Sequence, residues 1–223
     1  MVKERLAQNA LTILVTGVGA PGTRGTLHAL KKNHQDEERN LKIKKIIGID
    51  LRQDAIGKYW VDKFYNVPSP ESENYVGQIN DICSEESVDI IIPQTTRETA
   101  ELSKNLKRIR SKVTVSKISA IEKANNKYEL MRACERLEIP IPEFFLVKSL
   151  DGLIDRAKEL GYPEKEVVVK PPVSSGSRGF RVLRENTSWN ARRFLSEKPS
   201  AGEITLDDLC KIFTRGEDFP ELL

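Results

Sequence analysis

Short apolar runs alternate with amphipathic segments through the first half of the chain. Runs with the character of buried strands occupy 11–16 (LTILVT), 45–50 (KIIGID), 63–67 (KFYNV), 88–93 (VDIIIP) and 112–116 (KVTVS). Segments at 23–32, 77–84 and 98–110 separate some of these runs and are predicted to be helices; the last carries Leu102, Leu106 and Ile109 at helical spacing. Strands that alternate with helices predict a doubly wound parallel sheet with right-handed crossovers.

The pattern changes after about residue 118. A long helix is predicted over 120–137, ended by the IPIPE stretch, and the remaining predicted elements are a strand at 144–147, a helix at 150–160, an antiparallel hairpin of 167–170 with 180–183, and a helix at 206–213. The predicted fold class is therefore α/β, with a doubly wound domain at 1–118 and a linker helix with a smaller α+β lobe at 119–223.

Composition and charge exclude several classes of protein. The 36 basic and 33 acidic residues give a net charge of only +3, which argues against a nucleic-acid or anionic-membrane partner. Three cysteines without a C-x-x-C pair and only two histidines argue against a disulfide framework, a zinc site and a Ser-His-Asp triad. No apolar run approaches the roughly 20 residues that span a bilayer, so the chain is predicted to be cytoplasmic, with no membrane partner.

The first glycine-rich stretch has the spacing of a dinucleotide-binding loop. Gly17, Gly19 and Gly22 form G-x-G-x-x-G between a predicted strand and a predicted helix, and Asp50 ends the second strand, where an NAD protein has its ribose-binding carboxylate. Thr23 and Arg24 exclude a P-loop, which requires Lys and then Ser or Thr there. No Tyr-x-x-x-Lys pair or well-placed histidine offers hydride chemistry. The glycines also fit the tight turn that any doubly wound domain needs.

The second glycine-rich stretch, EVVVKPPVSSGSRGFRVL at 166–183, points more directly to a ligand. A strand delivers Lys170, two prolines stiffen its exit, and Ser174–Gly179 forms a hydroxyl-rich loop before the chain returns. Backbone amides and hydroxyls of such a loop can donate to phosphate oxygens, with a lysine at its base. The alternative is a flexible surface hairpin.

These two lysine-bearing segments resemble the ATP-grasp family. The resemblance rests on NNKYELMRACERLEIPIPEFFLV followed, after a helix, by VVVKPPVSSGSRGFRVL, and it covers essentially the whole chain. In that family two lysines contact the nucleotide, and they match Lys127 and Lys170 here. Asn126 stands where the family usually has Asp. The chain is most similar to carbamoyl-phosphate-synthase-like and pyrrolysine-biosynthesis-like carboxylate–amine ligases.

The resemblance implies two sets of site residues. The nucleotide is expected at Lys127, Lys170, Ser174, Ser175, Gly176, Ser177, Arg178 and Gly179. A carboxylate or acyl-phosphate substrate is expected at Gly17, Gly19, Gly22, Thr96 and Arg97, because ligands of parallel sheets bind at the carboxyl ends of the strands. Arg97 fits a solvated helix-start arginine equally well. Glu98 is expected to favour the helix amino terminus and to have no part in catalysis.

The activity implied is ATP-dependent formation of an acyl phosphate, which an amine then attacks. ATP and Mg²⁺ are the expected cofactors, with the metal ligands beyond Leu223, so the 223 residues are interpreted as a fragment that is inactive alone. A small carboxylate is the expected partner, and a homodimer is left open. Two alternatives stand beside this hypothesis: an NAD(P)-dependent oxidoreductase that uses Gly17–Gly22, and a non-catalytic nucleotide-binding or scaffold protein.

Overall fold

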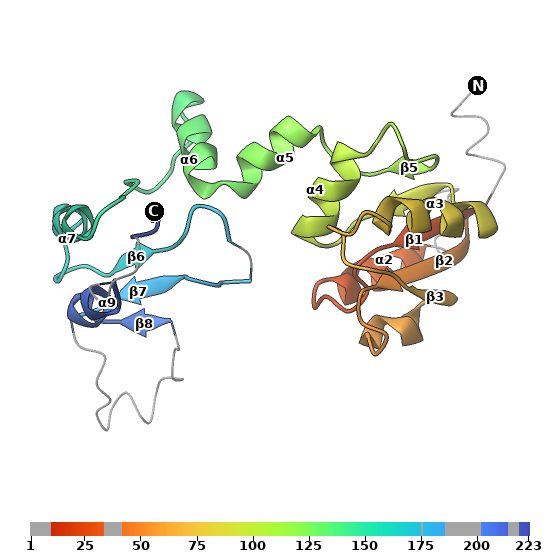
Figure 1. The fold of residues 1–223 in the computed structure, drawn as a ribbon, viewed down its shortest axis with the longest axis horizontal. Coiled ribbons are helices and arrows are strands. Elements are labelled where there is room, and N and C mark those ends of the chain that lie inside the picture. Colours follow the sequence, from red (N-terminus) through yellow and green to blue (C-terminus); the bar gives the residue numbers. More distant parts are fainter. Residues whose placement is uncertain (1–9, 34–41, 175, 186–201, 214–218) are drawn as a thin grey trace. The chain divides into compact units, whose positions relative to one another are not determined.

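The chain divides into two compact units. The computed structural model describes residues 10–33, 42–174, 176–185, 202–213 and 219–223. The first unit is Met1–Glu122 and the second is Lys123–Leu223, and each has its own sheet and hydrophobic core. Figure 1 shows the elements of both units. The boundary predicted at 118 lies at the start of helix α5.

The first unit is built on a five-stranded parallel sheet in the order β3-β2-β1-β4-β5. Its elements in chain order are β1 (Leu11–Val15), α2 (Thr23–Asn33), β2 (Ile43–Asp50), the 3-10 helix η2 (Ile56–Trp60), β3 (Lys63–Asn66), α3 (Tyr75–Glu85), β4 (Ile90–Ile92), α4 (Thr96–Lys104), β5 (Lys112–Val113) and α5 (Ile118–Asn125). The doubly wound parallel sheet predicted from the sequence is confirmed. The short helix η2 was not predicted.

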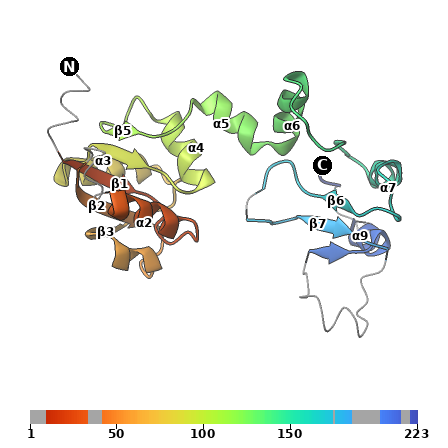
Figure 2. The same ribbon diagram turned by 180° about the vertical axis from the view of Figure 1, so that it is seen from behind.

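Alternating side chains of each strand fill two separate cores, one on each face of the sheet. Leu14 of β1 packs into the core shared with α3 and α4, whereas Ile13 and Val15 pack into the core beneath α2. Figure 2 shows the same layers from behind. Because both faces are covered, the strands need apolar residues at successive positions, which is why they appear as continuous apolar runs in the sequence.

Helix α4 is shorter than predicted. It was expected to reach residue 110, but it ends at Lys104, and Asn105 forms the cap. The Asn105 side-chain amide donates to the backbone oxygen of Glu101 at 3.0 Å and to its carboxylate at 2.7 Å. A side chain that satisfies carbonyls at the end of a helix favours termination there, although the apolar spacing continues beyond it.

The second unit is a smaller α+β body. It contains α6 (Lys127–Arg136), α7 (Leu150–Glu159), β6 (Val167–Val169), β7 (Arg181–Leu183), β8 (Glu203–Ile204) and α9 (Leu206–Phe213). Strands β6 and β7 form the predicted antiparallel hairpin, and β8, which was not predicted, pairs parallel to β7. Leu183 of β7 is fully buried in the core of this unit, which also contains Leu153 of α7 and Leu209 of α9.

The last two residues add a line of pairing beside β6. Leu222 exchanges both backbone hydrogen bonds with Val147, at 2.8 and 3.0 Å. Leu223 exchanges both of its own with Lys170, at 2.8 and 2.9 Å. Consecutive residues therefore bond to opposite neighbours, as in a strand inside a sheet. The strand predicted at 144–147 is reduced to the bridge at Val147.

The single helix predicted over 120–137 is wrong, because it is broken at Asn126. This residue has extended backbone angles, and its side-chain oxygen accepts from the backbone N–H groups of Tyr128 and Glu129 at 3.1 and 3.2 Å. The chain therefore ends α5 before Asn126 and starts α6 after it. Asparagine is a favoured N-cap because its short side chain replaces the missing helical acceptors.

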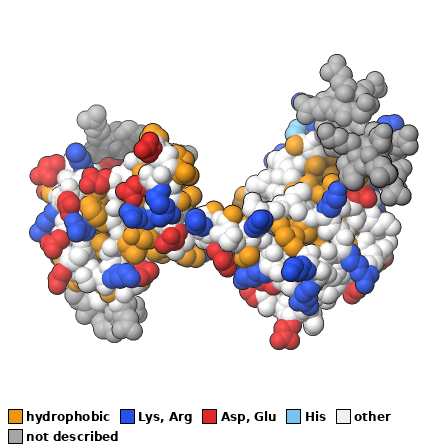
Figure 3. Space-filling view, turned by 90° about the horizontal axis from the view of Figure 1, so that it is seen from above, with side chains coloured by type: hydrophobic (Ala, Val, Ile, Leu, Met, Phe, Trp, Pro, Cys, Tyr) orange, Lys and Arg blue, Asp and Glu red, His pale blue; other side chains and the backbone are white. Residues whose placement is uncertain are grey.

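Charges of both signs are interspersed over the surface. Figure 3 shows Lys and Arg side chains beside Asp and Glu side chains, with hydrophobic side chains between them, and no face of one sign in this view of the described residues. None of the described helices is long and apolar enough to cross a membrane.

Candidate functional site

The strand order creates a switch point in the first unit. Strands β2 and β4 flank β1, so the connections after β1 and β4 leave the sheet in opposite directions. Ligands of open α/β sheets bind where this happens, at the carboxyl ends of the strands. The predicted substrate residues lie in these two loops: Gly17, Gly19 and Gly22 follow β1, and Thr96 and Arg97 follow β4.

Gly17 lies against the start of α4. Its φ of +55° is in the left-handed region, and its carbonyl accepts a 2.9 Å hydrogen bond from the buried Thr23 hydroxyl. A Cβ atom at Gly17 would lie 2.6 Å from Cγ2 of Thr95 and 2.7 Å from Oε2 of Glu98. Glycine is therefore needed here for both backbone conformation and close packing.

Gly19 and Gly22 differ in their surroundings. The N–H of Gly19 donates to Oδ2 of Asp50 at 2.7 Å, and the other oxygen of that carboxylate accepts from the N–H of Arg52 at 2.8 Å. The carboxylate of Asp50 is therefore the hydrogen-bond acceptor for one backbone N–H of the G-x-G-x-x-G loop, that of Gly19. Gly22 is exposed, and no atom of the described residues lies within 4 Å of a Cβ built on it.

Arg97 faces a carboxylate of its own unit. Its Nε donates to Oε1 of Glu71 at 2.5 Å, and its Nη2 donates to the other oxygen of Glu71 and to Ser69 Oγ. The Arg97 guanidinium lowers the pKa of Glu71 to about 2. Any substrate carboxylate would compete with Glu71 for Arg97. Thr96 beside it is exposed.

Glu98 is a buried carboxyl beneath the glycine loop, with only 5% of its surface exposed. Thr95 caps α4, and its hydroxyl donates to Oε2 of Glu98 at 2.7 Å. Burial raises the pKa of Glu98, and the hydrogen bonds from Thr95 oppose that shift. Sequence reasoning assigned Glu98 to the helix end and missed its burial; the T-x-x-E spacing indicates the cap but not the packing of the loop over it.

Lys170 carries an unpaired ammonium in the described part of the second unit. Its backbone is held by Leu223, and its half-buried side chain follows the end of β6. Among the described residues, no hydrogen bond or ion pair engages its ammonium. Its charge is close enough to Lys127 to lower the pKa of that residue. An ammonium at the end of a strand, with no anion bonded to it among the described residues, is suited to binding one.

Lys127 points at the start of the second glycine loop. Its ammonium donates to Ser174 Oγ at 2.9 Å and to the carbonyl oxygen of Ser174 at 3.0 Å, and it lies 3.3 and 3.4 Å from the carbonyls of Pro171 and Pro172. Burial lowers the pKa of Lys127, and the charge of Lys170 lowers it further. The structure therefore brings both predicted lysines to one loop.

The loop itself turns through left-handed backbone conformations. Gly176, Ser177 and Gly179 have φ values of +60°, +57° and +74°. A Cβ on Gly179 would lie 2.6 Å from the ring of Pro171, so this glycine permits a close return. Ser174 is partly buried, Arg178 is exposed, and Ser175 lies outside the described residues. Successive amides in such turns form concavities that bind anions.

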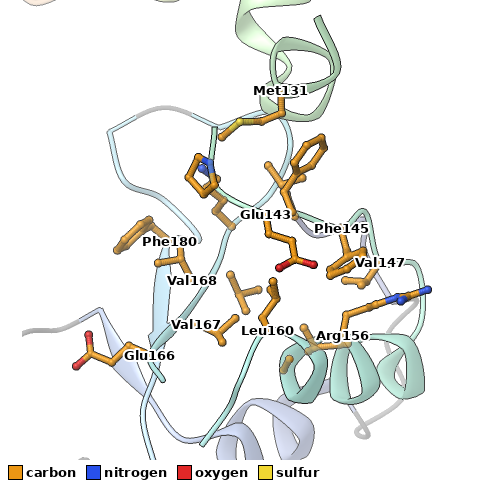
Figure 4. A pocket seen from close by; sticks show the side chains of 17 residues that line it. Met131, Glu143, Phe145, Val147, Arg156, Leu160, Glu166, Val167, Val168 and Phe180 are labelled. Atoms are coloured by element: carbon orange, nitrogen blue, oxygen red, sulfur yellow. The ribbon is translucent and has the colours of Figure 1, made fainter. Parts of the chain in front are cut away.

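An apolar pocket of about 480 Å³ adjoins Lys170 in the same unit. Phe145, Leu160, Val168 and Phe180 line it, and Glu143 extends its carboxylate into it (Figure 4). Val168 and Phe180 are 42% and 36% exposed, so the pocket presents apolar surface to solvent. Sequence reasoning did not identify this pocket, because its walls come from segments far apart in the chain. No group of three or more metal-ligating side chains occurs among the described residues.

Comparisons with known proteins agree with the sequence resemblance. Residues 13–118 match the family described as PylC-like, N-terminal domain. The chain is also 26% identical over 119 residues to the carbamoyl phosphate synthase large chain of Thermus thermophilus, a match that covers 53% of this chain and 11% of that protein. Both matches support the similarity of this chain to ATP-grasp proteins.

Solved structures of ATP-grasp proteins share the fold. The chain matches N5-carboxyaminoimidazole synthetase from Staphylococcus aureus, solved with ADP, at a TM-score of 0.58 and 16% identity over 96% of this chain and 48% of that one. It also matches the biotin carboxylase domain of Hydrogenobacter thermophilus 2-oxoglutarate carboxylase, solved with MgADP and bicarbonate, at a TM-score of 0.52 and 18% identity over 77% of this chain and 37% of that one. This chain therefore spans less than half the length of these relatives.

Proposed function

We propose that this chain is the amino-terminal portion of an ATP-dependent carboxylate–amine ligase, and that its second unit binds the phosphates of ATP. The observation that carries the proposal is the ammonium of Lys170, unpaired among the described residues, beside a loop of left-handed residues. Backbone amides and hydroxyls of Ser174–Gly179 would donate to the phosphate oxygens. Lys127, at the start of the same loop, adds positive charge.

The apolar pocket beside Lys170 is suited to binding the nucleoside part of ATP. Val168 and Phe180 line the same pocket as Lys170, and both are exposed. A purine base packed there would bury their apolar surface, with its phosphates directed to the lysine end. The base and the phosphates would then occupy adjoining parts of the second unit.

The reaction proposed proceeds in two balanced steps. An oxygen of the substrate carboxylate attacks the γ-phosphorus of ATP, the bond to ADP breaks, and an acyl phosphate forms. The amine then attacks the acyl carbon, phosphate leaves, and the nitrogen loses a proton. Lys170 would stabilise the negative charge on the transferring group. Magnesium, when bound, would neutralise phosphate charge, and none of the described residues is assigned to hold it.

The carboxylate substrate is proposed to bind the first unit, at the switch point formed by the loops after β1 and β4. Gly17, Gly19 and Gly22 would shape the floor, and Thr96 and Arg97 would contact the carboxylate once Arg97 leaves Glu71. Because the chain spans less than half of the matched structures, we assign the activity to the whole ligase and not to these 223 residues.

Calorimetric titration with ATP tests the proposal. Lys170→Met removes one charge-assisted contact, so ATP should bind about tenfold to hundredfold more weakly. Lys158→Met is the matched control, since Lys158 is an exposed lysine of α7 in the same unit. Equal ATP affinity in the Lys170 variant and the original protein would show that the phosphates bind elsewhere.

A further inference from the structure

Two threonine hydroxyls hold the buried carboxyl group of Glu98. The hydroxyl of Thr95 donates to Oε2 of Glu98 at 2.7 Å. Thr16 is fully buried directly after β1, and its hydroxyl oxygen accepts the N–H of Gln94 at 3.2 Å, which leaves the hydroxyl proton free to donate. Burial raises the pKa of Glu98, and hydrogen bonds from Thr95 and Thr16 oppose that rise.

A third hydroxyl, that of Tyr75, lies close to the same carboxyl group. Tyr75 begins α3, its side chain is fully buried in the core shared with α4, and its oxygen has no hydrogen-bond partner among the described residues. Burial raises the pKa of Tyr75, and the negative charge of Glu98 raises it further. A buried hydroxyl without a partner carries a free-energy cost. A carboxylate accepts several hydrogen bonds, so ionised Glu98 is an acceptor that can satisfy Tyr75.

The carboxyl group of Glu98 thus lies where three elements meet. The hydroxyls around it come from the end of β1, the cap of α4 and the start of α3. Gly17 packs against it as well, since a Cβ built on Gly17 would lie 2.7 Å from Oε2 of Glu98. Arg97 immediately precedes Glu98 in α4. The place of the Glu98 side chain therefore determines how the loop after β1 meets the residues proposed to bind a carboxylate.

Stability alone does not account for a carboxyl group at this position. Burial disfavours the ionised form of Glu98, and the like charge of Asp50, at the end of β2, disfavours it further. The glycine loop at 16–22 contains no titratable side chain. Three further charged side chains act on Glu98 or Tyr75: Glu71, Arg97 and Glu101. A buried group that costs stability when it ionises is better explained by a role in the site than by packing.

We infer that Glu98 is a positioning residue of the proposed carboxylate site, and that Tyr75 is the third donor that holds its carboxylate in place. The inference rests on the proposed function for its ligand, but the contacts around Glu98 exist without one. With its carboxylate held by three hydroxyls, Glu98 fixes the spacing between Gly17 and Arg97. Glu98 itself touches no substrate in this arrangement.

Carbon-13 NMR of protein with labelled glutamate measures the titration of Glu98, whose signal is identified by its loss in Glu98→Gln. Tyr75→Phe removes a donor to the ionised form, so the pKa of Glu98 should rise further above 4.5, and the proton should bind about tenfold more tightly. Tyr59→Phe is the matched control, because Tyr59 is exposed in η2. An unchanged titration of Glu98 in Tyr75→Phe would overturn the role of Tyr75.

Amide hydrogen exchange measures the positioning role. The N–H groups of Val18 and Ala20 donate to backbone carbonyls at 3.1 and 2.9 Å, so both amides report on opening of the glycine loop. Above the pKa of Glu98, Tyr75→Phe should lower their protection factors about tenfold. The same change in a Glu98→Gln background should have a smaller effect, because no carboxylate is left to hold. Equal effects in the two backgrounds would reduce Tyr75 to a packing residue and overturn the inference.

Titration with acetate separates this inference from the proposed function. Acetate should shift the NMR signal of the Arg97 Nε–H group, and Tyr75→Phe should weaken acetate binding about tenfold by misplacing the loop. If acetate binds equally well to both proteins, Glu98 does not position the site. If the original protein shows no shift while Tyr75→Phe still loosens the loop, the hold of Glu98 on the loop stands and the proposed carboxylate site fails.

Discussion

The carboxylate of Asp50 accepts a 2.7 Å hydrogen bond from the backbone N–H of Gly19, so the end of β2 closes onto the glycine loop after β1. A Cβ on Gly19 would lie 2.9 Å from the same oxygen, which explains the small residue. In an NAD-binding protein an acidic residue at this place binds the ribose hydroxyls. Here both oxygens of Asp50 already accept backbone N–H groups.

This contact leads us to expect no nicotinamide cofactor at Gly17–Gly22. A dinucleotide would have to displace the Asp50 bonds and bring a negative pyrophosphate close to that carboxylate. Titration with NADH and NADPH should give no binding tighter than about millimolar, an affinity of roughly 4 kcal/mol. Micromolar binding of either cofactor would instead favour the oxidoreductase alternative.

Gly17→Ala should destabilise the first unit by about 1–3 kcal/mol, because the new methyl group must share space with Thr95 and Glu98 at a left-handed backbone position. Gly22→Ala is the matched change in the same loop, where the added methyl meets no described atom. We expect it to alter the free energy of unfolding by no more than about 0.5 kcal/mol. Urea denaturation of the two variants compares them, and equal losses would contradict the packing described for Gly17.

Glu98→Gln should change how stability depends on pH. Burial raises the pKa of Glu98 in the folded protein above its ordinary value of 4.5, so the folded state binds the proton more tightly than the unfolded state. Stability is therefore lost as pH rises from 4.5 through the folded pKa. Glutamine cannot ionise, so the variant should gain stability relative to the original protein across this interval.

Unfolding by urea at several pH values between 4.5 and neutrality measures this difference. Glu122→Gln is the control, because Glu122 is exposed. Parallel pH profiles for Glu98→Gln and the original protein would show that the carboxyl group of Glu98 titrates normally.

Glu86 should give the opposite dependence in acid. Hydrogen bonds from Lys45, Lys63 and Tyr65 lower its pKa to about 2, from an ordinary value of 4.5. Its contribution to stability is therefore complete above pH 4.5 and is lost as pH falls towards 2. Lys45→Met removes the largest cause and should make the loss in acid smaller, whereas Lys44→Met, on a neighbouring exposed lysine, should not. Acid unfolding curves of the two variants that coincide would contradict this assignment.

The sequence alone was sufficient for the class of fold. Strands buried on both faces must be apolar at successive positions, and the helices that cover them must be amphipathic. Both patterns extend over only a few neighbouring residues, so the order of strands and helices can be predicted from local sequence. The break at Asn126 was also within reach, because Asn126 and Glu129 have the spacing of a capping box. The apolar spacing on either side of Asn126 is consistent with one continuous helix and conceals this local signal.

Tertiary structure decided what the candidate site residues contact. Asp50 binds the Gly19 amide, Arg97 binds Glu71, and Lys127 binds Ser174. Each of these contacts depends on which distant segment of the chain packs beside the side chain. The burial of Glu98 depends in the same way on the loop of Gly17. The type of a residue determines which hydrogen bonds its side chain is able to make. Which partner it bonds to depends on the packing of segments far apart in the chain, and no local sequence pattern contains that information.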